Sequence, residues 1–163
     1  MNNKFFEVNN VLSSASHIAT VKSIQNGAVS SRDWQPLHTN QTWAMSEGKL
    51  PNIIMNNYTL NGLIIKYITD IYGHATRIGK VSFKMKKPIC PEDVLEFQGL
   101  VIHKQKIDDS RSLLQVDVRV QVDKKISASA KVILAVNESG EPLASPWKLS
   151  PSEWSACLKL CQN

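Results

Sequence analysis

A carboxylate and an imidazole lie five positions apart in residues 31–38, which read SRDWQPLH. Pro36 stiffens the intervening turn, so Asp33 and His38 can reach one water molecule if the loop folds back on itself. A carboxylate accepts protons and an imidazole exchanges them near neutral pH, so this pair is suited to activating water. A structural interpretation is also open: Asp33 as a turn or cap residue, and His38 bonded to a neighbouring backbone carbonyl.

The start of a long amphipathic helix follows about twenty residues later, at Asn56 and Asn57. The unpaired N–H groups and the dipole at a helix N-terminus favour negative charge. If this end lies beside the carboxylate and the imidazole, it can polarise a carbonyl group next to the activated water. Helix capping explains the two asparagines as well and is compatible with that role.

The first element that positions this site is the helix itself. We predict it over Asn57–Tyr72, with Gly73 ending it. Tyr58, Gly62 and Ile65 extend the apolar character around the helix, which predicts that a sheet wraps it. Gly62 is expected to let another backbone approach closely. The apolar stripe at three- and four-residue steps consists of Leu60, Leu63, Ile64, Tyr67, Ile68 and Ile71.

A two-residue period replaces the helical period after the glycine. Alternation of apolar and polar residues predicts strands over residues 81–85, 94–103, 114–122 and 126–136, the last two as a hairpin, with a further strand near 18–24. This order predicts the α+β class, with one long helix packed on a curved, mainly antiparallel sheet.

Length and composition indicate one soluble domain: 163 residues, 42% of them hydrophobic and 20% charged. We assign residues 1–139 to this domain and residues 140–163, which are punctuated by prolines, to an appendage. The sequence contains no apolar run of membrane-spanning length and no apolar secretion signal, so we expect no membrane association and a cytoplasmic location. The odd number of cysteines suits a reducing compartment, and Cys157 and Cys161 are interpreted as ordinary thiols.

The net charge of +5 favours anionic ligands, but the basic residues are dispersed and aromatic residues make up 7% of the chain, which disfavours nucleic acid as a partner. In the densest basic stretch, residues 80–87, polar and apolar residues alternate. This alternation predicts a strand with one solvated face. An alternative is that Lys84, Lys86 and Lys87 bind the phosphates of a nucleotide-tailed ligand.

Three segments, SRDWQPLHTNQTWA, NIIMNNYTLNGLIIKYITDIYG and RIGKVSFKMKKPICPEDVLEFQG, together resemble the MaoC-like (R)-specific enoyl-CoA hydratases, which have the hot-dog fold. The resemblance covers roughly residues 18–136. It is sharpest at the signature Asp-x-Asn-Pro-(Leu, Ile or Val)-His, which here runs from Asp33 to His38 with Gln35 at the asparagine position. Within that family, the residues RDWQPLH and the asparagine-rich helix start are most similar to subunits that act on steroid side-chain CoA thioesters, some of which work in heteromers.

The resemblance implies syn addition of water to a trans-2-enoyl-CoA, with Asp33 and His38 holding the water and an (R)-3-hydroxyacyl-CoA as product. It implies an oxyanion hole formed by the backbone N–H of Asn56, which stands where the family has glycine, while Met55 stands where it has histidine. Glu92 replaces the glycine of a Pro-Gly-Asp turn. Coenzyme A enters as part of the substrate, and neither a metal nor a separate cofactor is expected.

Several alternatives accompany this interpretation. Trp34 and Trp43 flank the loop and either wall an acyl pocket or belong to the core. A hot-dog thioesterase would use Asp70 or Thr59 and direct water to the thioester carbonyl. A non-catalytic acyl-CoA-binding subunit would depend on an active partner. A sheet edge left by strands around one helix predicts a homodimer or a heterodimer with another hot-dog subunit.

Overall fold

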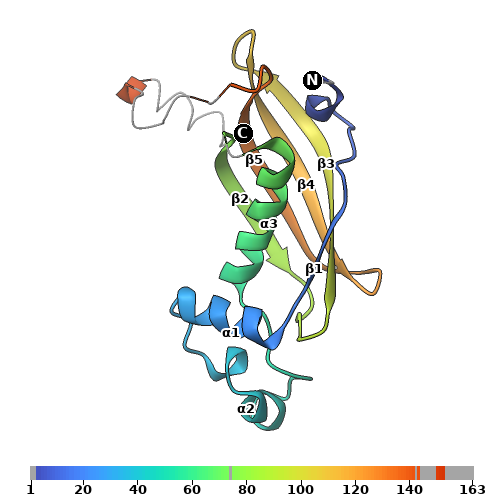
Figure 1. The fold of residues 1–163 in the computed structure, drawn as a ribbon, viewed down its shortest axis with the longest axis vertical. Helices are drawn as coiled ribbons and strands as arrows, with labels where there is room; N and C mark the ends of the chain where they lie inside the picture. The colour runs from blue at the N-terminus through green and yellow to red at the C-terminus, as the bar shows by residue number, and fades with distance from the viewer. Residues whose placement is uncertain (1–2, 74, 142, 144–149, 153–163) are drawn as a thin grey trace.

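A computed structural model of the chain describes residues 3–73, 75–141, 143 and 150–152. It contains a five-stranded sheet with the long helix α3 lying along one face (Figure 1). The elements in chain order are η1 (Asn3–Phe6), β1 (Ala15–Ile18), α1 (Val21–Ser30), η2 (Pro36–His38), α2 (Gln41–Ser46), α3 (Asn57–Tyr72), β2 (Arg77–Met85), β3 (Val94–Lys106), β4 (Arg111–Val122) and β5 (Lys125–Asn137). The α+β class is confirmed.

The strands follow the order β1-β3-β4-β5-β2, and each neighbouring pair is antiparallel. Alternation in β4 buries Val116 and Val118 while Asp117 and Arg119 face the other way. Because side chains of a strand alternate between the two faces, one register suffices to put Leu114, Val116, Val118 and Val120 on the same, buried side. The four strands predicted after the long helix and the hairpin of β4 and β5 are confirmed.

Helix α3 has the predicted bounds. The side chain of Asn56 caps its start, and it ends at Gly73, whose φ of 86° lies in the left-handed region that favours glycine. The predicted close approach at Gly62 is wrong, because a Cβ atom added there meets nothing within 4 Å. The close approach occurs instead at Gly27 of α1, where an added Cβ would lie 1.9 Å from Thr59 Oγ1. Glycine at position 27 therefore lets α1 pack directly on α3.

The predicted strand near residues 18–24 is also wrong. Strand β1 ends at Ile18, and α1 begins at Val21. Thr20 and Ser23 form a capping box, in which the Thr20 hydroxyl oxygen accepts from the Ser23 N–H at 3.0 Å and Ser23 Oγ accepts from the Thr20 N–H at 2.9 Å. Two backbone donors at the helix start are thereby satisfied locally, which favours the helix over a longer strand.

The chain before β1 lies against the sheet. The Leu12 N–H donates to Gly99 O at 2.9 Å, and the Asn9 N–H donates to Val101 O at 2.8 Å. Every helix in the described part of the chain falls short of the length and apolar character of a membrane span. The cytoplasmic location and the domain boundary at residue 139 stay predictions, and Cys157 and Cys161 lie outside the described residues.

Candidate active site

Helices α1 and α2 lie beyond the end of the sheet (Figure 1), and the chain between them contains Asp33 and His38, the latter as the last residue of η2. His38 Nε2 lies 3.2 Å from Asp33 Oδ2. The chain reverses just after α1: Arg32 takes a left-handed φ of 55°, and the Asp33 N–H donates to Ala28 O at 2.9 Å. Pro36 then begins the short helix η2, which carries His38 back toward the carboxylate.

The tautomer of His38 follows from its second contact. Nδ1 lies 2.7 Å from Ile54 O, and because a carbonyl oxygen only accepts hydrogen bonds, Nδ1 carries a proton. Nε2 is therefore the ring nitrogen that faces the carboxylate. The 3.2 Å separation between Nε2 and Asp33 Oδ2 is that of an ion pair, in which the imidazole is charged only when Nε2 also carries a proton. The bond to a backbone carbonyl and the contact with Asp33 thus coexist on one ring.

Asp33 and His38 are mostly buried but remain partly accessible to solvent. The His38 side chain is 8% exposed and that of Asp33 is 18% exposed. Partial burial strengthens their electrostatic interaction, while the exposed portion of Asp33 leaves a route for a small molecule. Among the described residues, Asp33 Oδ1 makes no hydrogen bond. The pair therefore keeps one oxygen available for a ligand.

Asn56 joins the pair to the start of α3. Its Nδ2 donates to Asp33 Oδ2 at 3.1 Å and to Ser31 Oγ at 2.8 Å. Its Oδ1 accepts from the Thr59 N–H at 3.0 Å and from Thr59 Oγ1 at 2.6 Å. The side chain is thus a helix cap and a carboxylate partner together, which places the amide-rich end of α3 beside Asp33 and His38.

The backbone of Asn56 is extended, with φ −82° and ψ 164°, and does not adopt a left-handed, glycine-like conformation. Its carbonyl accepts from the Leu60 N–H, whereas no hydrogen bond within the described part of the chain uses its backbone N–H. Met55 before it is buried and anchored by donation of its N–H to Ile89 O at 2.8 Å. The oxyanion role of the Asn56 N–H stays a prediction.

The two tryptophans lie in different surroundings. Trp34 is 69% exposed, and Trp43 of α2 is half-buried against Gly48. Sequence reasoning missed a groove of about 510 Å³ between the start of α3 and the end of β2. The four-residue spacing of Asn57 and Asn61, which puts both amides on one helix face, was the available signal. The groove is lined by Asn57, Tyr58, Asn61, Phe83 and Met85.

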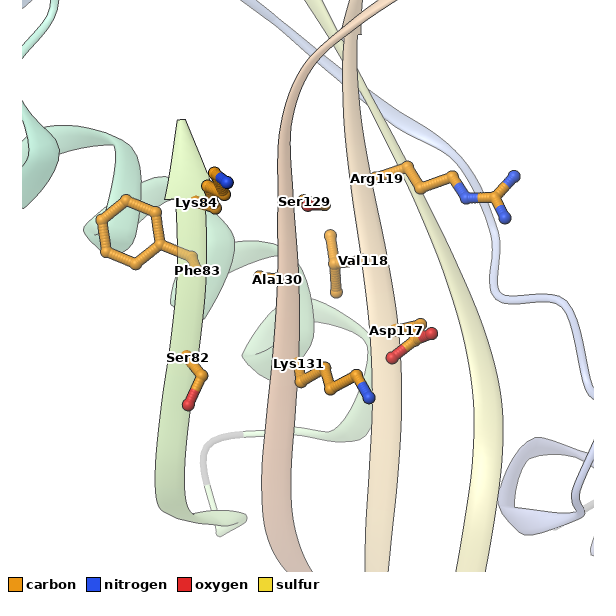
Figure 2. A pocket seen from close by; sticks show the side chains of 9 residues that line it. All are labelled: Ser82, Phe83, Lys84, Asp117, Val118, Arg119, Ser129, Ala130 and Lys131. Carbon is orange, nitrogen blue, oxygen red and sulfur yellow. The ribbon is translucent and has the colours of Figure 1, made fainter. Parts of the chain in front are cut away.

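The three lysines of the basic stretch occupy two places: Lys84 lies within β2, and Lys86 and Lys87 follow its end. Lys84 lies on the outer face of the sheet, where Figure 2 shows Ser129 of β5 between it and Arg119 of β4; these residues and Lys131 line a pocket of about 360 Å³. Lys86 and Lys87 follow the end of β2, and the backbone N–H groups of both donate to Ser127 O. Since the loop after them reaches Met55 through Ile89 O, Lys86 and Lys87 are on the segment that runs toward the start of α3.

Other candidate nucleophiles and acids have different surroundings. Asp70 lies near the far end of α3, and its carboxylate pairs with Lys66 on the exposed surface. The hydroxyl of Thr59 is engaged by Asn56. Burial, together with the nearby Asp93 carboxylate, raises the pKa of the Cys90 thiol, which disfavours the reactive thiolate. None of these three groups contacts Asp33 or His38 in the described structure.

The family model described as MaoC like domain matches residues 9–125. Among solved structures, the chain resembles the ChsH1-ChsH2 complex from Mycobacterium tuberculosis with 25% identity and a TM-score of 0.72, over 80% of this chain and 98% of that chain. It resembles the (R)-hydratase from A. caviae involved in PHA biosynthesis with 15% identity and a TM-score of 0.68, over 78% and 95%.

A third similar structure is the C-terminally truncated HadBC complex from Mycobacterium tuberculosis, a 3R-hydroxyacyl-ACP dehydratase, with 13% identity and a TM-score of 0.63 over 78% of this chain and 96% of that chain. A search of curated proteins gave no match. The sheet order, the helix α3 and these likenesses confirm the hot-dog fold.

Proposed function

Because the chain belongs to the family of MaoC-like domains, we propose that it adds water to the double bond of a trans-2-enoyl-CoA thioester and forms an (R)-3-hydroxyacyl-CoA. The observation that carries the proposal is the 3.2 Å contact between His38 Nε2 and Asp33 Oδ2 at the capped start of α3. Since the carboxylate and the imidazole lie this close, one water molecule can be within hydrogen-bond distance of both side chains. That water would meet a proton acceptor and a proton donor at once.

In the proposed reaction, the water oxygen bonds to C3 as its proton passes to the Asp33 and His38 pair. The electrons of the C2=C3 bond move toward the thioester carbonyl oxygen. They return when C2 takes a proton from the same pair, so both protons move on one face of the double bond. His38 Nδ1–H stays on Ile54 O throughout, and Nε2 is the ring nitrogen that exchanges protons.

The negative charge on the thioester oxygen needs a donor, and the backbone N–H of Asn56 at the start of α3 is the group that we assign to it. Coenzyme A enters as part of the substrate, with no metal and no separate cofactor in the proposed reaction. We assign Lys86 and Lys87 to its phosphates, because both follow the end of β2 on the segment that runs toward the start of α3. Lys84 faces the outer side of the sheet, so its contact requires a ligand that passes around the β2 edge.

A second hot-dog subunit is part of the proposal, since two of the similar structures are complexes of such subunits. Strand β2 is an edge strand, and Tyr58 beside it on α3 is 66% exposed. Trp34, next to the catalytic carboxylate, is also exposed. A partner covering these surfaces would bury the unpaired edge of β2 and turn the groove and Trp34 into walls of an acyl pocket.

The test uses the purified chain with two substrates: a straight-chain trans-2-enoyl-CoA, and a steroid whose side chain ends in a trans-2-enoyl-CoA thioester. The conjugated enoyl absorbance and free thiol are followed together. Loss of absorbance without thiol supports hydration, and the faster substrate indicates the acyl class. Thiol release would instead indicate a thioesterase. No change with either substrate would indicate a non-catalytic acyl-CoA-binding subunit, and would contradict an independent hydratase.

A further inference from the structure

We propose that the side-chain amide of Asn56 is a positioning residue for Asp33, a role that rests on the hydration proposed above. This role is distinct from that of its backbone N–H. The side chain is almost fully buried, with 2% of Asn56 exposed, and both of its polar atoms are bound. It therefore has one fixed orientation relative to the carboxylate.

The direction of each hydrogen bond follows from chemistry alone. The Thr59 N–H is a donor, so the atom that it contacts is the Asn56 carbonyl oxygen, Oδ1. The amino group Nδ2 must then face Ser31 and Asp33. Ser31 Oγ donates to Gly27 O at 2.7 Å, which leaves the oxygen of Ser31 free to accept from Nδ2.

Two groups lie against the same oxygen of Asp33: the Asn56 amide, which donates to it, and the His38 imidazole, which is at ion-pair distance. Oδ2 lies 3.1 Å from Asn56 Nδ2 and 3.2 Å from His38 Nε2, which come from different parts of the chain. Two fixed contacts on one oxygen define how the carboxylate is turned. Asp33 Oδ1, which makes no hydrogen bond among the described residues, is then the oxygen presented to water.

The start of α3 and the carboxylate are in this way tied to one side chain. Because Asn56 caps the helix through Oδ1 and holds Asp33 through Nδ2, the oxyanion donor and the proton acceptor keep a fixed separation. Reactions that need several groups around one water are sensitive to such separations, since misplacement by about 1 Å costs about 100-fold in rate.

Two substitutions separate capping from positioning. Serine and aspartate are both good N-caps, so Asn56→Ser and Asn56→Asp preserve the start of α3, but neither can donate from an amide to Asp33. We expect kcat to fall about 10-fold in Asn56→Ser and about 100-fold in Asn56→Asp, where a second carboxylate faces Asp33, with KM little changed. Wild-type kcat in both variants would overturn the proposal.

Asn40 provides the matched control. Its Oδ1 caps α2 by accepting from the Trp43 N–H at 3.0 Å, and it makes no contact with Asp33 in the described structure. Asn40→Ser and Asn40→Asp should retain wild-type kcat. If they lose as much activity as the Asn56 variants, the effect belongs to capping in general and the positioning role is wrong.

A proton NMR measurement tests the positioning without any turnover. In the wild-type protein the His38 Nδ1 proton, which is bonded to Ile54 O, should give a low-field signal whose position depends on the Asp33 carboxylate 3.2 Å from the other ring nitrogen. That signal should shift in Asn56→Ser, where the carboxylate turns, and keep its position in Asn40→Ser. An unshifted signal in Asn56→Ser would overturn the proposal. A wild-type protein that shows the signal but hydrates no enoyl-CoA would refute the proposed function alone.

Discussion

The two ends of α3 are held by different chemistry (Figure 1). At the N-terminal end the Asn56 amide, the Asp33 carboxylate and the His38 imidazole converge, and Asp33 Oδ1 remains available. At the C-terminal end the Tyr72 hydroxyl donates to Phe5 O at 3.1 Å, and its ring packs near that of Phe6. A polar cluster with an unused hydrogen-bond acceptor can bind a ligand and take part in a reaction. A cluster whose polar groups all bond within the chain contributes to stability instead.

The C-terminal end gains further support from the segment before β1. The hydroxyl of the buried Tyr67 donates to Ser13 O at 3.0 Å, and burial raises the pKa of Tyr67 to about 12, so this phenol stays neutral at physiological pH. On β3, Lys104 contacts Glu7 of the same N-terminal segment at 3.0 Å and Glu138, which follows β5, at 2.9 Å. Burial opposes the charge of Lys104, but its hydrogen bonds to Glu138 and Glu7 raise its pKa, so the ammonium stays charged.

The comparison predicts that changes at the first end affect turnover far more than folding. Asp33→Asn and His38→Ala should each lower kcat for enoyl-CoA hydration by about 100- to 10,000-fold, because each removes a group to which we assign proton transfer in the proposed reaction. Thermal unfolding should remain cooperative in both variants. Steady-state kinetics alongside calorimetry measure the two effects, and near-normal kcat in either variant would remove that residue from the mechanism.

Gly27→Ala should affect both the fold and the site, because α1 supports the N-terminal end through this glycine. The added Cβ would lie 1.9 Å from Thr59 Oγ1, which donates to Asn56 Oδ1. We expect a loss of about 1–3 kcal/mol in the free energy of unfolding from overpacking, measured by urea denaturation, together with reduced kcat.

Gly62→Ala is the matched control, since it places the same methyl group on α3 where nothing lies within 4 Å. Alanine is favoured over glycine in helices by up to about 1 kcal/mol, so this variant should be as stable as the wild type or more so. Equal destabilisation by both substitutions would mean that the packing of α1 on α3 is not the cause.

Tyr67→Phe should produce the opposite pattern to the catalytic variants. The ring and its stacking on Phe97 remain, but Ser13 O loses a donor from a buried hydroxyl, which should lower the free energy of unfolding by about 1 kcal/mol. Turnover should stay at the wild-type level. A fall in kcat larger than the loss of folded protein would show that the two ends of α3 are coupled.

The sequence predicted the elements that rest on a repeated pattern. Helix α3 has the predicted bounds because Leu60, Ile64 and Ile68 repeat over several turns and Gly73 stops them. The spacing of Asp33 and His38 indicated that they can meet, but the contact depends on the left-handed Arg32 and on Ile54 O, which no local pattern encodes.

The region around α1 was harder to predict because local and long-range signals compete there. The valine and isoleucine near its start favour a strand, and the capping box of Thr20 and Ser23 decides for a helix. The side-chain role of Asn56 was also missed, since a cap explains an asparagine fully until its amino group is seen beside Asp33. Contacts between residues distant in sequence carried this information.

The acid stability of the C-terminal end gives the smallest expected effect. Burial opposes ionisation of Glu138, but hydrogen bonds from Ser112 and Lys104 outweigh it and lower its pKa below the ordinary 4.5. A depressed pKa in the folded state means that the carboxylate's contribution to stability is present above its pKa in the unfolded state. That contribution is lost as the pH falls through the pKa of the folded state.

In wild-type protein the unfolding temperature should therefore fall more steeply below about pH 4.3 than in Glu138→Gln. At pH 7 that variant should be less stable by at most about 1 kcal/mol, since the ion pair is partly exposed. Parallel slopes for the two proteins in acid would show that this carboxylate does not link stability to pH, while unchanged kcat at pH 7 would keep it apart from the catalytic end of α3.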